Sequence, residues 1–434
     1  MTLAKRDLDQ FLDLLSARAL FDSPCFPVFV RIGGGPTLVC HDLGRDDGMA
    51  VEITAEGYRM TQQPTARMIR AHGMRPLPLP KSGDVKFSGF AKFRKLSEFD
   101  EQTWPLLLAF LLSAMRPDGP YPCLAVEGEQ GSGKSTICEM CKRIIDPSVP
   151  MRLSMPDSAQ DMMIIASHRH LVIFDNLSSV KNDMSDALAA LATKSGYETR
   201  ELYSNGNLFT IEIARPFALN GIGEFIHRPD LMDRAIPLRL EAMRSGTRRS
   251  EAEIWRDLEL LLPELLHDLY TAVACALRNF STTPTPTTFR MADAARWLVA
   301  AEPETVLPPG TILSAIEKAQ ISTQADLALS DSLFPELERV LLDGDFEGRP
   351  ADLLDLLRSD ERRKFERYFP ATPAQLSTKL RRLRPALAKA GIIVEFPART
   401  RDGRNIKARL TPEAREAAEL AKRQMINRAS KGVF

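Results

Sequence analysis

The feature that most constrains the fold is a glycine-rich stretch at residues 128–135. It reads Gly-Glu-Gln-Gly-Ser-Gly-Lys-Ser and matches the pattern G-x-x-x-x-G-K-[ST] at every fixed position. The apolar residues 123–126 just before it predict a short buried strand, and a helix is expected to begin near Lys134. Strand and helix patterns then alternate to about residue 240. We therefore expect a parallel α/β sheet.

Each fixed position in this loop suits the binding of phosphate groups. Gly131 and Gly133 let backbone N–H groups face the phosphates, since no Cβ stands in the way, and the positive end of the helix dipole adds to the attraction. Lys134 is expected to contact the β- and γ-phosphates, and the Ser135 hydroxyl to bind Mg²⁺. The expected cofactors are therefore ATP and Mg²⁺. The expected nucleotide contacts are Gly128, Glu129, Gln130, Gly131, Ser132, Gly133, Lys134, Ser135 and Thr136.

A second acidic element follows 40 residues downstream. Residues 170–176 read His-Leu-Val-Ile-Phe-Asp-Asn, which predicts a buried strand with Asp175 at its carboxyl end, where it can hold Mg²⁺ together with Ser135. Asn176 occupies the next position. Its amide can orient a water molecule but cannot take a proton from it. Hydrolysis is therefore expected to be slow or to use another carboxylate, for which Glu224 is a candidate.

A further strand and an arginine-rich turn follow. Residues 215–221 read Arg-Pro-Phe-Ala-Leu-Asn-Gly and place Asn220 at a strand end, where its amide is expected near the γ-phosphate; alternatively, Asn-Gly is only a turn. Segment 228–234 contains Asp and Arg, which usually form a surface turn with ion pairs. The functional alternative is an arginine finger that reaches a neighbouring subunit's nucleotide, with Arg234 as first choice and Arg228 as second.

Two regions carry candidate nucleic-acid contacts. A predicted type I′ hairpin around Asn205-Gly206 presents Arg200, Tyr203, Asn205 and Asn207. The second region is basic: the net charge of the chain is zero, yet residues 361–434 hold 19 Lys and Arg against 7 Asp and Glu. Such asymmetry suggests contact with a polyanion.

The basic region also has a recognisable order of elements. A helix at 372–390 carries four leucines on one side and is followed by strands at 392–396 and 406–410 around a turn. This order favours a winged helix-turn-helix that binds DNA. The alternative is a solvated charged helix beside a hairpin. The expected contacts are Lys379, Arg381, Arg382, Arg384, Arg401 and Arg404.

Sequence composition also suggests domain boundaries and location. We expect a small mixed α+β N-terminal domain (1–100), an ATPase core (101–245), a helical lid and connector (246–345), the winged helix (351–410) and a basic tail (411–434). The N-terminal part should contain a helix near 8–19 and β-strands at 27–32, 37–42, 50–54 and 58–61, with turns at 33–35 and 46–48; residues 343–350 look like a linker.

Other composition features exclude several classes of protein. The longest apolar stretch, 106–112, is too short to span a bilayer, and the amino terminus lacks a signal-peptide core. A cytoplasmic protein that does not contact membranes is expected. Cys138 and Cys141 form a C-x-x-C pair inside the helix after the loop, and no second pair has zinc-ligand spacing. They are therefore interpreted as a buried helix face.

Taken together, the motifs resemble those of AAA+ ATPases. The hairpin before the Asn220 strand resembles the pre-sensor-1 β-hairpin group, which includes superfamily 3 and MCM helicases. The chain is also similar to helicase-like ATP-binding proteins of phages and integrative elements across roughly residues 25–300. The segments that carry the similarity are 122–136, 174–178, 185–188, 199–203, 215–222, 228–234 and 290–297.

The resemblance implies a ring, expected to be a hexamer, with ATP between subunits and hairpins that grip single-stranded DNA in the pore. It also implies a second sensor at Arg290 or Arg296. Two departures from the group are the absence of Lys or Arg at the hairpin tip and the presence of Asn176. The expected function is an ATP-dependent DNA translocase or replicative helicase of a phage or mobile element. The alternative is a nucleotide-switched assembly platform that recruits or regulates a nuclease or replication partner.

Overall fold

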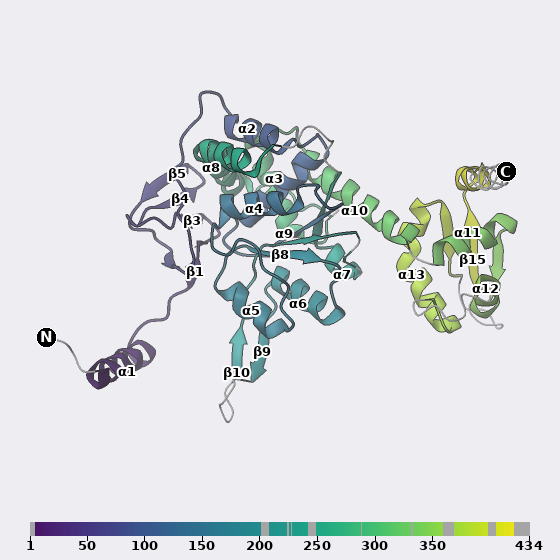
Figure 1. Ribbon diagram of the computed structural model, residues 1–434, viewed down its shortest axis with the longest axis horizontal. Coiled ribbons are helices and arrows are strands. Elements are labelled where there is room, and N and C mark those ends of the chain that lie inside the picture. The colour runs from purple at the N-terminus through teal and green to yellow at the C-terminus, as the bar shows by residue number, and fades with distance from the viewer. Residues whose placement is uncertain are drawn as a thin grey trace.

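The centre of the molecule is a four-stranded parallel sheet with the order β12-β7-β11-β8 (Figure 1). This confirms the expected parallel α/β sheet. Its strands are short and almost wholly apolar, as buried parallel strands must be, and they are β7 (Cys123–Gly128), β8 (Val172–Leu177), β11 (Phe217–Gly221) and β12 (Ala235–Leu240). The computed structural model describes residues 5–200, 208–223, 225–226, 228–241, 249–287, 289–330, 333–358, 369–397 and 405–420.

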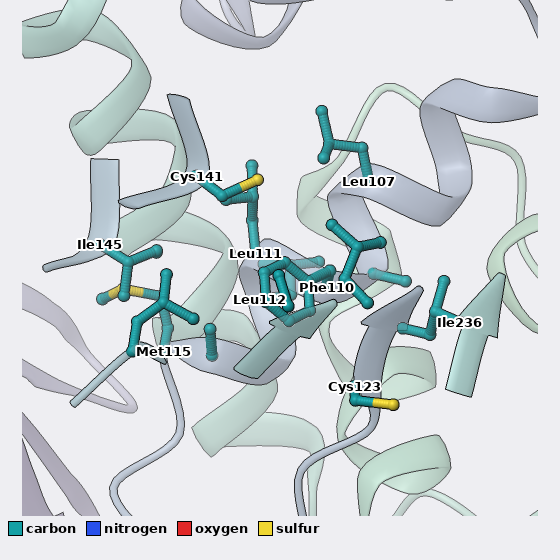
Figure 2. Close-up of a cluster of buried hydrophobic side chains, with 14 of the residues drawn as sticks. Leu107, Phe110, Leu111, Leu112, Met115, Cys123, Cys141, Ile145 and Ile236 are labelled. Carbon is teal, nitrogen blue, oxygen red and sulfur yellow. The ribbon is translucent and has the colours of Figure 1, made fainter. Parts of the chain in front are cut away.

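Helix α3 (Thr103–Ala114) is apolar on all sides and buried from Trp104 to Ala114. It packs against β7 and β12. Figure 2 shows Leu107, Phe110, Leu111 and Leu112 of this helix meeting side chains of the sheet and of α4. A helix without a polar face must lie inside the core. The other helices around the sheet are α4 (Lys134–Ile145), α5 (Ala159–Ser167), α6 (Asn182–Thr193) and α7 (Pro229–Met232).

Helix α8 (Glu251–Asn279) begins with a capping box, in which Ser250 and Glu253 satisfy each other's backbone N–H groups. Among the described residues it is the one helix long and apolar enough to cross a membrane, but most of its apolar stretch is buried inside the protein. We therefore interpret it as a core helix. It packs against α2 and α9. The helices that accompany it are α2 (Ser88–Ser97), α9 (Ala292–Ala301), the 3₁₀ turn η1 (Glu302–Glu304) and α10 (Thr311–Ser330).

The N-terminal part contains an antiparallel sheet in the order β2-β3-β4-β5 and a parallel pair, β1-β6. The expected turn at 33–35 is wrong: these glycines lie in strand β2, and the chain turns after them. A Cβ on Gly33 would lie 2.1 Å from the Phe29 ring, so the glycine serves close packing within the strand. The elements are α1 (Lys5–Phe21), β1 (Val28–Val30), β2 (Ile32–Gly35), β3 (Leu38–Asp42), β4 (Ala50–Thr54), β5 (Gly57–Thr61) and β6 (Arg67–Ile69).

A buried ionic cluster connects this N-terminal sheet to the end of α4. Arg31 donates to Asp146 at 3.1 Å, and Lys142 donates to the other carboxylate oxygen at 2.8 Å. All three side chains are at most 2% exposed. Arg31 also donates to the backbone carbonyls of Asp42, Arg75 and Pro147. Such pairing is required, since an unpaired buried charge is strongly destabilising.

The C-terminal part has its own hydrophobic core and a three-stranded antiparallel sheet in the order β13-β15-β14. The expected linker at 343–350 is wrong in part, because strand β13 lies within it and pairs with β15. Three residues are too few to show an alternating pattern. The elements are α11 (Leu333–Asp343), β13 (Phe346–Gly348), α12 (Pro350–Leu357), α13 (Pro373–Lys389), β14 (Ile392–Glu395) and β15 (Ile406–Leu410).

Candidate functional site

The loop between β7 and α4 depends on three glycines in conformations that side chains disfavour. Gly128, Gly131 and Gly133 have φ values of 157°, 80° and 85°. At Gly128 a Cβ would also lie 2.5 Å from the carbonyl oxygen of Leu240 on β12. Lys134 begins α4, and its Nζ donates to the backbone carbonyls of Gly128 and Glu129 at 2.9 and 2.6 Å. The lysine therefore lies across the mouth of the loop.

Three polar residues from three different elements meet beside this loop. Ser135 Oγ on α4 lies 3.4 Å from Asp175 Oδ1 at the end of β8. Asn220 on β11 donates its Nδ2 to Ser135 Oγ at 3.0 Å and also to Asp175 Oδ1. Parallel strands end at the same edge of a sheet, which explains the convergence. Asn220 is 2% exposed, and its Oδ1 has no hydrogen-bond partner in the described structure.

Asn176 follows Asp175 and has a left-handed backbone, with φ of 61°. It lies opposite an irregularity in the pairing of β8 with β11, between Leu219 and Gly221. Asn adopts this conformation more readily than residues with longer side chains, which gives a local reason for Asn at this position. The side chain is exposed. The other candidate base, Glu224, lies outside the described residues.

Sequence patterns did not reveal Arg152, which nevertheless contacts the site directly. Its Nη1 forms an ion pair with Asp175 Oδ2, and its Nε donates to Glu139 Oε1 on α4. The neighbouring Leu153 is hydrogen bonded to the backbone of β8 on both sides: Leu153 N to Ile173 O and Asp175 N to Leu153 O, each at 2.9 Å. A cavity of 340 Å³ is lined by Glu139, Pro150, Met151, Arg152, Leu153, Ser154, Asp175 and Asn176.

A larger cavity of 1390 Å³ adjoins the glycine-rich loop on its other side. It lies between α4, the carboxyl end of β12, the start of α8 and the helix α10. Apolar side chains such as Ile137, Met140 and Ile254 line it together with hydroxyl groups from α10. The size and mixed lining fit a nucleoside-sized ligand. Its cationic lining residues are Arg239, Arg249 and Lys318.

Arg290 and Arg296, the residues that family resemblance suggested for a second sensor, do not line this cavity. Arg290 pairs with Asp230 at 2.8 Å. Arg296 donates to the backbone carbonyls of Ser281 and Thr283 and lies over the Phe280 ring. Both are thus held by contacts elsewhere.

The two finger candidates lie at the opposite edge of the sheet. In the register of β12 with β7, Ala235 pairs with Cys123 and Leu240 with Gly128. Arg234 therefore lies roughly 20 Å from the glycine-rich loop, at about 3.3 Å per residue. It is held by Asp230 at 2.5 Å and is 14% exposed, whereas Arg228 pairs with Asp186 and is 40% exposed.

The expected hairpin is present as β9 (Tyr197–Arg200) and β10 (Leu208–Ile211), an antiparallel pair that projects from the body below α5 (Figure 1). Arg200 ends β9, but its side chain is not described. Residues 201–207 lie outside the described chain, and with them Tyr203, Asn205 and Asn207.

The basic helix α13 buries its expected leucine face in the C-terminal core. Arg381 and Arg384 are exposed, Lys379 is partly exposed, and Arg381 lies 4.6 Å from the centre of the Phe396 ring. The side chain of Arg382 and the whole of Arg401 and Arg404 lie outside the described structure. On the strands, Lys407 and Arg409 pair with Glu347 and Glu395.

Cys138 and Cys141 are both buried on α4, in agreement with a structural helix face, and burial raises the pKa of both thiols. Among the described residues, no group of three or more His, Cys, Asp or Glu side chains is arranged to hold a metal. A magnesium site of one carboxylate and one hydroxyl, completed by phosphates and water, needs no such group.

Two family models match the chain. Residues 91–312 match the actinomycete integrative conjugative element replication protein, and residues 336–423 match the AICE RepA C-terminal domain. The first match alone spans more than half of the 434 residues. A search of curated proteins finds no match.

Three solved structures illustrate the similarity in fold. SCCmec type IV Cch, described as an active helicase, has 11% identity and a TM-score of 0.48 over 94% of this chain and 83% of its own. The C-terminal region of NrS-1 has 11% identity and a TM-score of 0.35 over 84% and 94%. The JCV helicase has 12% identity and a TM-score of 0.27 over 56% and 66%. All three TM-scores are below 0.5, and these likenesses support no inference about function.

Proposed function

The chain belongs to the family of actinomycete integrative conjugative element replication proteins, and on this premise we propose that it is an ATP-dependent DNA translocase or replicative helicase of such an element. It acts as a ring, with ATP bound between subunits. The observation that carries the proposal is the meeting of Lys134, Ser135, Asp175 and Asn220 beside a loop built on left-handed glycines.

The residues at this edge fit a nucleotide with its metal. The N–H groups of residues 129–135 and Lys134 hold the phosphates, and the larger cavity holds the nucleoside. Ser135 and Asp175 offer hard oxygen ligands, which Mg²⁺ prefers. Bound Mg²⁺ supplies neutralisation of the charge that develops on the β- and γ-phosphates. The buried, unpaired Oδ1 of Asn220 is an acceptor that can orient a water molecule.

A ring explains the position of the finger candidates. Arg234 and Arg228 lie at the edge of the sheet away from the loop of their own chain. An arginine in this position serves a nucleotide only across a subunit boundary, with the ATP of one subunit facing the finger of the next. A hexamer is the ring size that we propose.

Two elements are assigned to DNA. The order α11-β13-α12-α13-β14-β15, with the sheet order β13-β15-β14, supports a winged helix that meets duplex DNA through α13 and the turn before β15. The contacts on the winged helix are Lys379, Arg381, Arg382, Arg384, Arg401 and Arg404. The hairpin β9-β10 is assigned to single-stranded DNA in the pore, through Arg200, Tyr203, Asn205 and Asn207.

The second candidate function is a nucleotide-switched assembly platform with little hydrolysis. Asn176 favours it, because this position offers no carboxylate to activate water. In that case ATP binding holds the ring together, and the ring recruits a nuclease or a replication partner.

Steady-state ATP hydrolysis with and without single-stranded DNA separates the two functions. The variants are Lys134→Ala and, as a matched control, Lys194→Ala, whose lysine forms a surface ion pair with Asp118. For a motor we expect DNA stimulation that Lys134→Ala abolishes and Lys194→Ala retains. Tight ATP binding with negligible turnover indicates the switch. If the wild-type protein binds no ATP in calorimetry, both proposals fail.

A further inference from the structure

Asp175 accepts hydrogen bonds or ion pairs at both of its carboxylate oxygens. Oδ1 receives the side chains of Ser135 and Asn220. Oδ2 receives the guanidinium of Arg152, which also binds Glu139. A divalent cation at Asp175 requires the same oxygen lone pairs, and it would repel a guanidinium beside it. Arg152 and the cation therefore compete for one carboxylate.

Glu139 offers Arg152 another place to bind. It lies one helical turn after Ser135 on α4, and residues four apart share a helix face. The Glu139 side chain is 17% exposed, so its ion pair is partly shielded from water. The backbone beside Arg152 is fixed to β8 through Leu153. Only the arginine side chain has to rotate, and the 340 Å³ cavity gives it room.

We infer that Arg152 is an internal cation that a divalent metal displaces from Asp175, with Glu139 as the carboxylate that retains the displaced side chain. The inference rests on the proposed function in that Asp175 is a metal ligand. Arg152 is on this account a positioning residue, which sets how much divalent cation is needed to occupy the site. It keeps the carboxylate oriented toward Ser135 and Asn220 until the cation arrives.

The test is direct Mn²⁺ binding, followed by electron paramagnetic resonance, with the full-length protein in the presence and absence of ADP. Arg152→Ala removes the competitor, and we expect Mn²⁺ to bind about three- to tenfold more tightly, as fits the loss of one half-exposed ion pair. Glu139→Gln removes the second acceptor, so Mn²⁺ binding should weaken by a similar factor. These opposite signs are not expected from a purely structural ion pair.

The matched control is Arg143→Ala, since Arg143 also lies on α4 and pairs with Glu259, away from Asp175. It should leave Mn²⁺ affinity unchanged, and Arg152→Lys, which keeps the charge, should stay close to the wild type. Unchanged or weaker Mn²⁺ binding in Arg152→Ala overturns the inference, as does equal tightening in Arg143→Ala. If ADP has no effect on Mn²⁺ affinity in the wild type, the proposed nucleotide site fails, while the comparison of variants without ADP still decides the role of Arg152. Circular dichroism confirms that each variant is folded.

Discussion

Two buried histidines should make the stability of the protein fall as the solution becomes acidic. His41 Nε2 donates to the carbonyl of Ile145 at 2.9 Å, and its Nδ1 accepts from Tyr270 at 3.1 Å. His170 Nε2 donates to the carbonyl of Ala114 at 2.7 Å, and its Nδ1 has no partner in the described structure. Each nitrogen role follows from the carbonyl, which can only accept. Both rings therefore fit their sites as neutral imidazoles.

Burial lowers the pKa of both rings, His41 to about 3 and His170 to about 4, and the positive charges of Arg31 and Arg215 act in the same direction. The unfolded chain titrates near pH 6.5 and therefore binds more protons than the folded chain below that pH. The stabilising contribution is complete above pH 6.5 and is lost as the pH falls toward 4. At pH 5.0 each ring should remove about 2 kcal/mol of unfolding free energy, at about 1.4 kcal/mol per pH unit.

Urea unfolding between pH 7.5 and pH 5.0 measures this loss. In His170→Gln, whose amide can still donate to the Ala114 carbonyl, the difference in unfolding free energy between the two pH values should be about 2 kcal/mol smaller than in the wild type. His72→Gln, which alters an exposed ring, should keep the full pH dependence. If His170→Gln loses as much stability as the wild type, the ring is not held neutral in the folded state.

Three further predictions concern the site and the DNA contacts. Asn176→Glu should lower stability by about 1 kcal/mol because of its left-handed backbone, and it should raise ATP turnover if a missing base limits hydrolysis; unchanged turnover in a steady-state assay would contradict this. Arg234→Ala should reduce ATP turnover about a thousandfold or more with nucleotide binding intact by calorimetry, and normal activity would exclude it as the finger. Reversing the charge of Arg381 and Arg384 should weaken duplex binding and reduce the slope of log affinity against log salt by about one per lost phosphate contact; an unchanged slope in fluorescence anisotropy would refute the assignment of α13 to DNA.

Strong local patterns predicted most elements of the fold. The strand before the glycine-rich loop, the helix from Lys134 and the strand β15 lie where the sequence indicates them. Each has a clear period, or a turn residue at its boundary. Features that depend on distant parts of the chain were missed. The three residues of β13 form a strand only because β15 pairs with them, and Gly33 joins a strand because of its packing against Phe29.

The candidate site follows the same division. Ser135, Asp175 and Asn220 could be placed together from sequence, because parallel strands end at a common edge. Arg152 could not, since no motif surrounds it and its partners Glu139 and Asp175 are 13 and 23 residues away. The positions of Arg290 and Arg296 also depend on tertiary contacts that a single sequence does not reveal.

Helix α10 has a mechanical consequence that follows from its length and its two sets of neighbours. Its residues from Thr311 to Thr323 line the large cavity, it packs against α3 and β12, and it lies against α13 (Figure 1). A helix of 20 residues is about 30 Å long and stiff. A tilt of about 10° at the cavity would therefore move the far end by about 5 Å. The helix is thus a lever arm, through which a small closure around a ligand becomes a visible displacement of the basic C-terminal part.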